Sequence, residues 1–381
     1  MSENKRILFL DFSRTIAIIM MLQGHFISTT LEAYPRLIKH VQKNYYSLDS
    51  WFTVWATIRG LTAPLFFVIT GTVFSYLLHQ EFNASDLGYF ELNRVKKGFK
   101  RVLVLLIIGY LLQLNLSYLG YYLLGNINPH LLGFHILQCI GLSLFCILLF
   151  TPALNFLKRY SWLGFIFLAI ALFIFTSYIR NDSGFLLVGF NPIIQNVVQG
   201  PDTVFSILPW SGFVFFGAGF GQYLSLYGPG KKNRNVYFFL GIAGLFFHII
   251  SVGIFLFNNY FTNHSQTLYL WVYERIFQIS IVLMLLTYLS QFKVFQSTYL
   301  LAIGKETLVV YVLHAILLYG AITGVGLRVI WEHQFSALQS IFGAIIFVAI
   351  FVLFAPLIPK IHQTIAALKN YEFSNGKIKS K

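Results

Sequence analysis

The sequence predicts an all-α polytopic integral membrane protein: a helical bundle of about ten transmembrane helices with both termini on the cytoplasmic side. Of its 381 residues, 57% are hydrophobic and only 10% are charged, whereas soluble domains average roughly 25% charged residues. The apolar residues gather in runs of about 20, the length that crosses a bilayer. The basic residues are distributed unevenly between the loops, as cytoplasmic loops of membrane proteins require. The net charge of +14 therefore indicates topology and no nucleic-acid partner.

Ten apolar runs account for the ten predicted helices, because each is long enough to span a membrane. In chain order they cover residues 7–30, 52–78, 101–123, 131–153, 161–179, 204–226, 236–258, 268–290, 298–319 and 336–358. Asp11 and Arg14 interrupt the first run, so we do not expect a cleaved signal peptide. We interpret residues 1–360 as one transmembrane domain and residues 361–381 as a short basic cytoplasmic tail.

The loop charges predict the orientation. With the N-terminus inside, eighteen Lys and Arg residues fall on the inner side. The outer loops receive only Arg36, Lys39, Lys43, Arg180 and Arg328. This bias predicts cytoplasmic termini, in a multi-pass protein of the plasma membrane, which in a bacterium is the inner membrane.

The first predicted span carries three ionisable residues, Asp11, Arg14 and His25. Such residues are costly at membrane depth and are therefore functional candidates. Arg14 and His25 are eleven positions apart, which places them on one helix face about 16 Å apart along the axis. Asp11 can pair with Arg14 at i,i+3 spacing. The structural alternative is that Arg14 reaches the lipid headgroups and His25 bonds between helices.

The segment Leu-Asp-Phe-Ser-Arg that ends at Arg14, followed by ten residues and His25, resembles the first-span motif of the acyltransferase type 3 family. It is also similar to the related heparan-glucosaminide N-acetyltransferase family. Further segments continue the resemblance: Arg59–Gly71, Arg94–Arg101 as a basic loop, His135–Gly141, Leu208–Trp210 and Gly304–His314.

The resemblance implies an enzyme that moves an acyl group, usually acetyl, from cytoplasmic acyl-coenzyme A to an acceptor reached from the opposite membrane face. It implies that His25 is the catalytic histidine, with Arg14 on the donor side and Asp11 beside it. Heparan-type enzymes often carry asparagine at the position of His25 and a histidine in the following outer loop, which here is His40. Whether His40 or His314 shares the catalytic role stays open.

Acyl transfer from a thioester needs a site for the carrier's phosphates and a base for the acceptor. His25 acting as general base on a hydroxyl or amine would allow direct transfer without an acyl-enzyme intermediate. The candidates for binding the phosphates are Arg14, Arg94, Lys97, Lys100, Arg101, Lys231 and Lys232. For each of the loop cations, the alternative is ordinary positive-inside topology.

Five residues are candidates for binding the acceptor, which we expect to be a glycan, a glycolipid or a small molecule: Arg59, Trp210, Glu274, Arg275 and His314. Structural alternatives remain open: Glu274 and Arg275 can pair internally, and His314 can bond between helices. The histidines and the two cysteines lack metal-ligand spacing, so we expect no metal. A homodimer is an open possibility.

The competing function is a polytopic transporter or flippase of an anionic or sugar-linked substrate, in which intramembrane Arg, Glu and His would form the pathway. Against it, the sequence predicts neither paired broken helices nor two-fold symmetry of hydropathy.

Overall fold

A computed structural model describes residues 7–43, 50–118, 131, 133–181, 191–198, 203–261, 270–361 and 363–364. Within these ranges all regular elements are helices, which confirms the all-α prediction. The α-helices are α1 (Leu8–Thr30), α2 (Tyr34–Lys43), α3 (Trp51–Arg59), α4 (Thr62–Ala84), α5 (Asn93–Leu111), α7 (Ile136–Leu154), α8 (Ser161–Asn181), α9 (Pro192–Val198), α10 (Ile207–Tyr227), α11 (Arg234–Phe261), α12 (Leu270–Leu289), α13 (Thr298–Lys305), α14 (Thr307–Tyr319), α15 (Leu327–Trp331) and α16 (Ala337–Phe354). Short 3-10 helices are η1 (Tyr89–Glu91), η2 (Leu116–Tyr118), η4 (Asn155–Tyr160), η6 (Lys231–Asn233), η7 (Lys293–Gln296) and η8 (Ala355–Leu357).

Each of the ten predicted runs overlaps at least one of these α-helices. By length and apolar composition, five helical stretches of the described chain could cross a membrane, and a sixth if the bent pair α13–α14 is one span. These five are Trp51–Ala84, Ile136–Ser177, Lys231–Phe257, Leu270–Leu289 and Ala337–Ile361. The second of them comprises α7 and α8. The polar residues of α1 and the basic residues of α5 lower the hydropathy of those two helices. The count of ten crossings and the orientation in the membrane stay predictions.

Two predicted spans are each divided between two helices and one of them is sharply bent, whereas the sequence predicted no paired broken helices. The run 52–78 is divided between α3 and α4 at Gly60 and Leu61. The run 298–319 is divided at Glu306, where α13 and α14 meet at an angle of 81°. Glycine and charged residues stand at the breaks, Arg59 and Gly60 at the first and Lys305 and Glu306 at the second, but the apolar runs continue on either side of them.

A third correction concerns α5. The basic segment Arg94–Arg101 was expected to be a loop before a span over residues 101–123. In the structure it is helical, because α5 begins at Asn93 and ends at Leu111. Long basic side chains reach the aqueous phase from a helix as readily as from a loop, so their charge did not indicate a helix boundary.

Helices α4 and α10 form the closest packing in the protein. A Cβ atom at Gly71 would collide with the backbone of Val214, and one at Gly217 with the backbone of Val68. Gly221 meets the backbone of α4 one turn further on. Small residues let membrane helices approach until their backbones touch, and these glycines fix α4 against α10.

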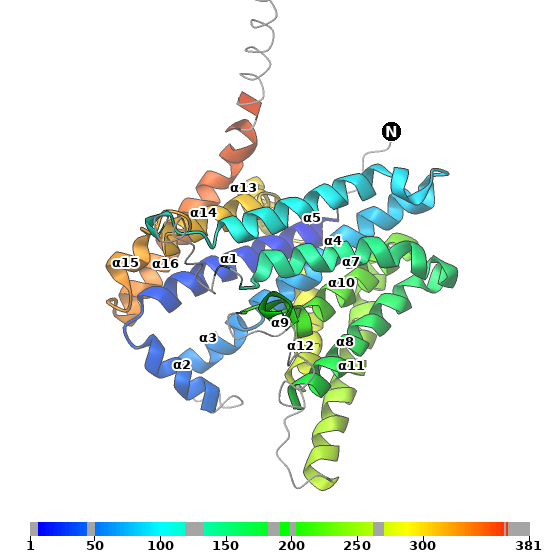
Figure 1. The fold of residues 1–381 in the computed structure, drawn as a ribbon, viewed down its shortest axis with the longest axis horizontal. Helices are drawn as coiled ribbons and strands as arrows, with labels where there is room; N and C mark the ends of the chain where they lie inside the picture. Colours follow the sequence, from blue (N-terminus) through cyan, green and yellow to red (C-terminus); the bar gives the residue numbers. More distant parts are fainter. Residues whose placement is uncertain are drawn as a thin grey trace, which may run out of the picture.

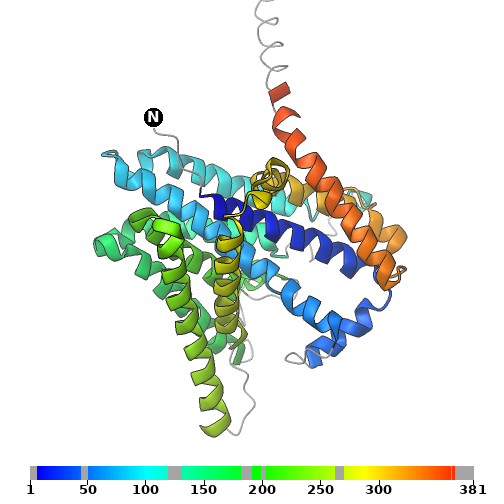
Figure 2. The ribbon, with the colours of Figure 1, turned by 180° about the vertical axis from the view of Figure 1, so that it is seen from behind.

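Helix α1 joins the two buried clusters of the bundle. Its first half, with Phe9 and Phe12, packs into the larger cluster around α4, α7 and α10. Its second half, with Leu22 and Phe26, packs into a smaller cluster with α14 and α16. Figure 1 and Figure 2 show α1 in the interior, between α16 and α4, while α11 and α16 lie at opposite ends of the molecule. The predicted functional residues of α1 therefore lie where the two clusters meet.

Candidate functional site

The ion pair predicted within α1 is present. Arg14 Nη1 lies 3.5 Å from Asp11 Oδ1, and both side chains are largely buried. A guanidinium held away from water is stabilised by such a partner. Gly304, at the end of α13, approaches the α1 backbone so closely that a Cβ there would lie 2.6 Å from the Asp11 carbonyl oxygen. This contact places the following residue, Lys305, beside Arg14.

Three neighbouring cavities surround Arg14, with volumes of about 440, 230 and 370 Å³. Arg14 lines all three. The other cations that line at least one of them are Arg94, Lys97, Arg101 and Lys305. Asp11 is the only carboxylate among the described residues that line them. Five cations against one carboxylate give this space, which we call the cationic cavity, a positive charge that favours anions.

Helix α5 supplies three of these cations at i, i+3 and i+7, which places Arg94, Lys97 and Arg101 along one face. The Glu81 carboxylate accepts hydrogen bonds from the backbone N–H groups of Asn93 (3.1 Å) and Arg94 (2.7 Å). A carboxylate at a helix N-terminus satisfies free N–H groups and complements the helix dipole. Glu81 therefore fixes the start of α5. The sequence alone does not indicate this cap, because Glu81 lies twelve positions before Asn93.

Of the other predicted phosphate-binding residues, Lys100 is exposed on α5 and Lys231 and Lys232 belong to η6 before α11. None of the three lines the cationic cavity. Lys305, which was not among the predicted donor-site residues, does. Its position depends on the break between α13 and α14, which the apolar run over residues 298–319 does not predict.

A second centre lies further along α1, at His25. The rings of His25 and His314 stack with centroids 5.4 Å apart. The Tyr319 hydroxyl lies 2.6 Å from His25 Nδ1. The Tyr311 ring lies 5.0 Å from that of His314, as their spacing on one helix face predicted. Thus α14 presents Tyr311, His314 and Tyr319 to one histidine of α1, and we call this group the histidine centre.

The histidine centre and the cationic cavity adjoin. Tyr311 lines the cavity of about 230 Å³ together with Arg14 and Arg101, and its ring contacts His314. His314 is buried, and its Nδ1 has no hydrogen-bond partner among the described residues. A buried polar atom without a partner is uncommon and calls for an explanation, of which a bound water is one.

Arg59 lies on the side of His25 that is remote from Arg14. Its Nη1 donates to the Tyr34 hydroxyl (2.7 Å) and its Nη2 to Ser28 Oγ (3.3 Å). The guanidinium also lies over the Trp55 ring, 5.5 Å from its centroid. A Cβ at Gly24 would lie 2.7 Å from Arg59 Nε, so the arginine packs directly on α1 beside His25.

The remaining acceptor candidates do not gather at His25. Arg275 donates to Gln278 Oε1 (2.9 Å) and to the Thr57 carbonyl oxygen (3.4 Å), so it supports the break between α3 and α4. Glu274 lies 3.0 Å from His248 Nδ1 of α11.

Trp210 packs against rings of the large cluster, among them Phe67, Phe205 and Trp271. His40 is exposed on α2. No group of three or more His, Cys, Asp and Glu side chains gathers in the described ranges in a way that could hold a metal ion.

Comparison with known proteins gives one family. The family model described as heparan-alpha-glucosaminide N-acetyltransferase, catalytic, matches residues 6–236, which is more than half of the chain. The match includes Asp11, Arg14, His25, Arg59 and all of α5, and it ends before α14. A search of curated proteins gives no match. The heparan-type resemblance is thereby confirmed, and the type 3 features stay a prediction. The chain belongs to the heparan-alpha-glucosaminide N-acetyltransferase catalytic family, a family of membrane acetyltransferases.

Proposed function

We propose that the protein transfers an acetyl group from cytoplasmic acetyl-coenzyme A to an amine or hydroxyl of a glycan or glycolipid on the opposite membrane face. The observation that carries the proposal is that a cavity lined by five cations adjoins a histidine held by a tyrosine hydroxyl. Phosphate-rich donors need the first feature, and deprotonation of an acceptor needs the second.

The cationic cavity is the proposed donor site. The phosphates of the coenzyme would bind to Arg14, Arg94, Lys97, Arg101 and Lys305. Tyr311 lies between this cavity and the histidine centre, so the thioester would extend past Tyr311 to reach the histidines. The rise of about 16 Å between Arg14 and His25 gives the distance that an extended donor must cover.

His25 is the proposed general base. To accept a proton at Nε2, the ring must carry its own proton on Nδ1 and donate it to the Tyr319 oxygen, 2.6 Å away. The acceptor nitrogen or oxygen attacks the thioester carbonyl carbon while its proton passes to Nε2. The carbon–sulfur bond then breaks, and the proton moves from Nε2 to the leaving thiolate. Acetyl is transferred directly, without an acyl-enzyme.

Arg59 is the residue proposed to bind the acceptor. It lies next to His25 on the side away from the cationic cavity, where a substrate from the opposite face would enter. The family description names an α-glucosaminide, so an amino sugar is the first acceptor to test. His314 shares the histidine centre, and its free Nδ1 supports a role in holding acceptor or water.

The experiment measures release of free coenzyme thiol by the purified protein with acetyl-coenzyme A and an α-glucosaminide. We expect release that depends on the acceptor, loss of at least a hundredfold in His25→Gln, and retained donor binding in that variant. Acetyl-coenzyme A labelled in the acetyl group should leave no label on the protein when the acceptor is omitted. A transporter or flippase would release no thiol under any of these conditions, and that result would overturn the proposal.

A further inference from the structure

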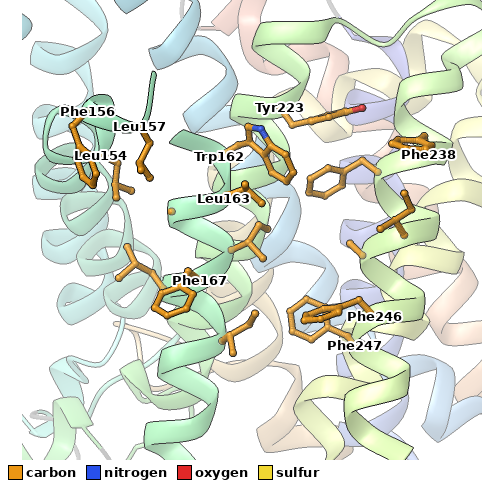
Figure 3. Close-up of a pocket in the computed structure, with 17 residues that line it drawn as sticks. Leu154, Phe156, Leu157, Trp162, Leu163, Phe167, Tyr223, Phe238, Phe246 and Phe247 are labelled. Carbon is orange, nitrogen blue, oxygen red and sulfur yellow. The ribbon is translucent and has the colours of Figure 1, made fainter. Parts of the chain in front are cut away.

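An apolar groove of about 790 Å³ lies between α8 and α11, far from the histidine centre. Figure 3 shows its lining, with Leu163 and Phe167 on one wall and Phe238 and Phe246 on the other. Helix α8 packs on α10 and α11 packs on α12, so the groove opens where α8 and α11 face each other. An apolar groove between two helices of membrane-spanning length suits a hydrocarbon chain.

One end of the groove differs in chemistry from the rest. Trp162 and Tyr223 meet there, with ring centroids 5.4 Å apart (Figure 3). Trp162 Nε1 is buried and has no hydrogen-bond partner among the described residues. The indole N–H can only donate, so an acceptor at this end of the groove would satisfy it.

The same end is strongly basic. Arg159 lies between two residues that line the groove, Leu157 and Trp162. It is exposed, and it donates a hydrogen bond to the Tyr160 hydroxyl (2.6 Å). Arg234 begins α11 and acts electrostatically on Tyr223. Lys158 belongs to η4, just before α8, and Lys231 and Lys232 belong to η6, just before α11. The helices α8, α10 and α11 contain no Asp or Glu, so no carboxylate of these helices neutralises the cations.

We propose that this groove binds an anionic phospholipid of the cytoplasmic leaflet. One acyl chain fills the groove between α8 and α11. The phosphate lies at the end formed by Trp162 and Tyr223, where Arg159 and Arg234 supply positive charge and Trp162 Nε1 supplies a hydrogen bond. Basic sites between helices on the cytoplasmic side are the type that recognises anionic headgroups. Charge complementarity selects this occupant, because the cationic group of a zwitterionic headgroup would be repelled by Arg159 and Arg234, which offsets the attraction of its phosphate.

The site is independent of the proposed acetyl transfer. Its expected effect is to hold α11 against α8, since a ligand that binds only the folded state stabilises it.

The test compares phosphatidylglycerol with phosphatidylcholine of identical acyl chains, added to the detergent-purified, delipidated full chain. Native mass spectrometry measures the lipid retained, and thermal unfolding measures the stabilisation. We expect stronger retention and a higher unfolding temperature with phosphatidylglycerol. Arg159→Gln should weaken phosphatidylglycerol binding about fivefold, as expected for one charge at a lipid surface, and change phosphatidylcholine binding much less, because the net charge of that headgroup is zero.

The matched control is Lys293→Gln, which removes an exposed cation that does not line the groove and should change neither lipid. Ala243→Phe fills the groove from α11 and should weaken both lipids. Equal retention of the two lipids by the wild-type protein would overturn the proposal. So would an equal effect of Arg159→Gln and Lys293→Gln, because the charge at the groove would then have no specific role.

Discussion

The hydrogen bond between Tyr319 and His25 gives the sharpest test of the proposed chemistry. Tyr319→Phe removes the oxygen that lies 2.6 Å from His25 Nδ1 and leaves the ring in place. In the proposed reaction His25 gains a proton and becomes positively charged, so the lost bond is one to a charged group. Such bonds contribute about 1.5–3 kcal/mol. If the bond strengthens only as the charge forms, kcat falls about 10- to 150-fold.

The same variant should leave donor binding unaffected, because Tyr319 does not line the cationic cavity. The assay is steady-state thiol release at varied acetyl-coenzyme A, with the unfolding temperature measured alongside. Tyr299→Phe, on the exposed side of α13, is the matched control and should resemble wild type. A kcat for Tyr319→Phe within twofold of wild type would refute the reasoning. An unchanged kcat with a raised KM for the donor would refute it as well, because the bond would then serve donor binding.

Three further predictions concern the donor site and the packing. Arg14→Gln should raise the KM for acetyl-coenzyme A at least tenfold through loss of charged hydrogen bonds. The control Lys231→Gln lies outside the cationic cavity and should not change this KM. Equal effects of the two variants in the same kinetic assay would contradict the assignment of the cavity. Glu81→Ala should lower the stability of the protein by about 1 kcal/mol through loss of the cap on α5. It should also raise the KM for the donor while kcat stays nearly constant. A fall in kcat alone would show that Glu81 does not serve donor binding. Gly217→Ala should lower the unfolding temperature strongly or prevent folding, because its Cβ meets the α4 backbone. Gly241→Ala has open space around it and should be neutral or stabilising by up to about 1 kcal/mol. A thermal shift assay that ranks the two variants the other way would contradict the packing argument.

The parts of the site that depend on one helix could be predicted from the sequence. Helical periodicity is local, so it was sufficient to place Asp11 beside Arg14 and to put Arg14 and His25 on one face of α1. The contact between Tyr311 and His314 followed from the same spacing. Apolar runs likewise located helices, because burial in a membrane demands length and hydrophobicity from each segment separately.

The parts that depend on two helices could not be predicted. His25 meets Tyr319 across 294 positions of sequence, and nothing in either segment encodes the other as its neighbour. The same holds for Glu81 and the start of α5. The division of α13 from α14 was missed because the apolar run continues on both sides of Lys305 and Glu306, so its hydropathy predicts a single span. Lys231 and Lys232 do not line the cationic cavity, since positive charge reports the membrane side of a residue and not the cavity that it lines. Their role in phosphate binding stays a prediction.

The straight helix α14 has a mechanical consequence. Its first turns, with Thr307 and Tyr311, form part of the wall of the cationic cavity, and its later turns carry the two side chains that hold His25. An α-helix transmits a tilt or a translation along its whole length with little internal deformation. A donor that displaces the wall of its own cavity must therefore also move the groups that orient the base. The 81° bend before Thr307 gives α14 an axis different from that of α13. If the cationic cavity binds the donor and His25 is the base, as proposed, donor occupancy and alignment of the base are coupled through α14, and we expect an ordered reaction in which the coenzyme binds first.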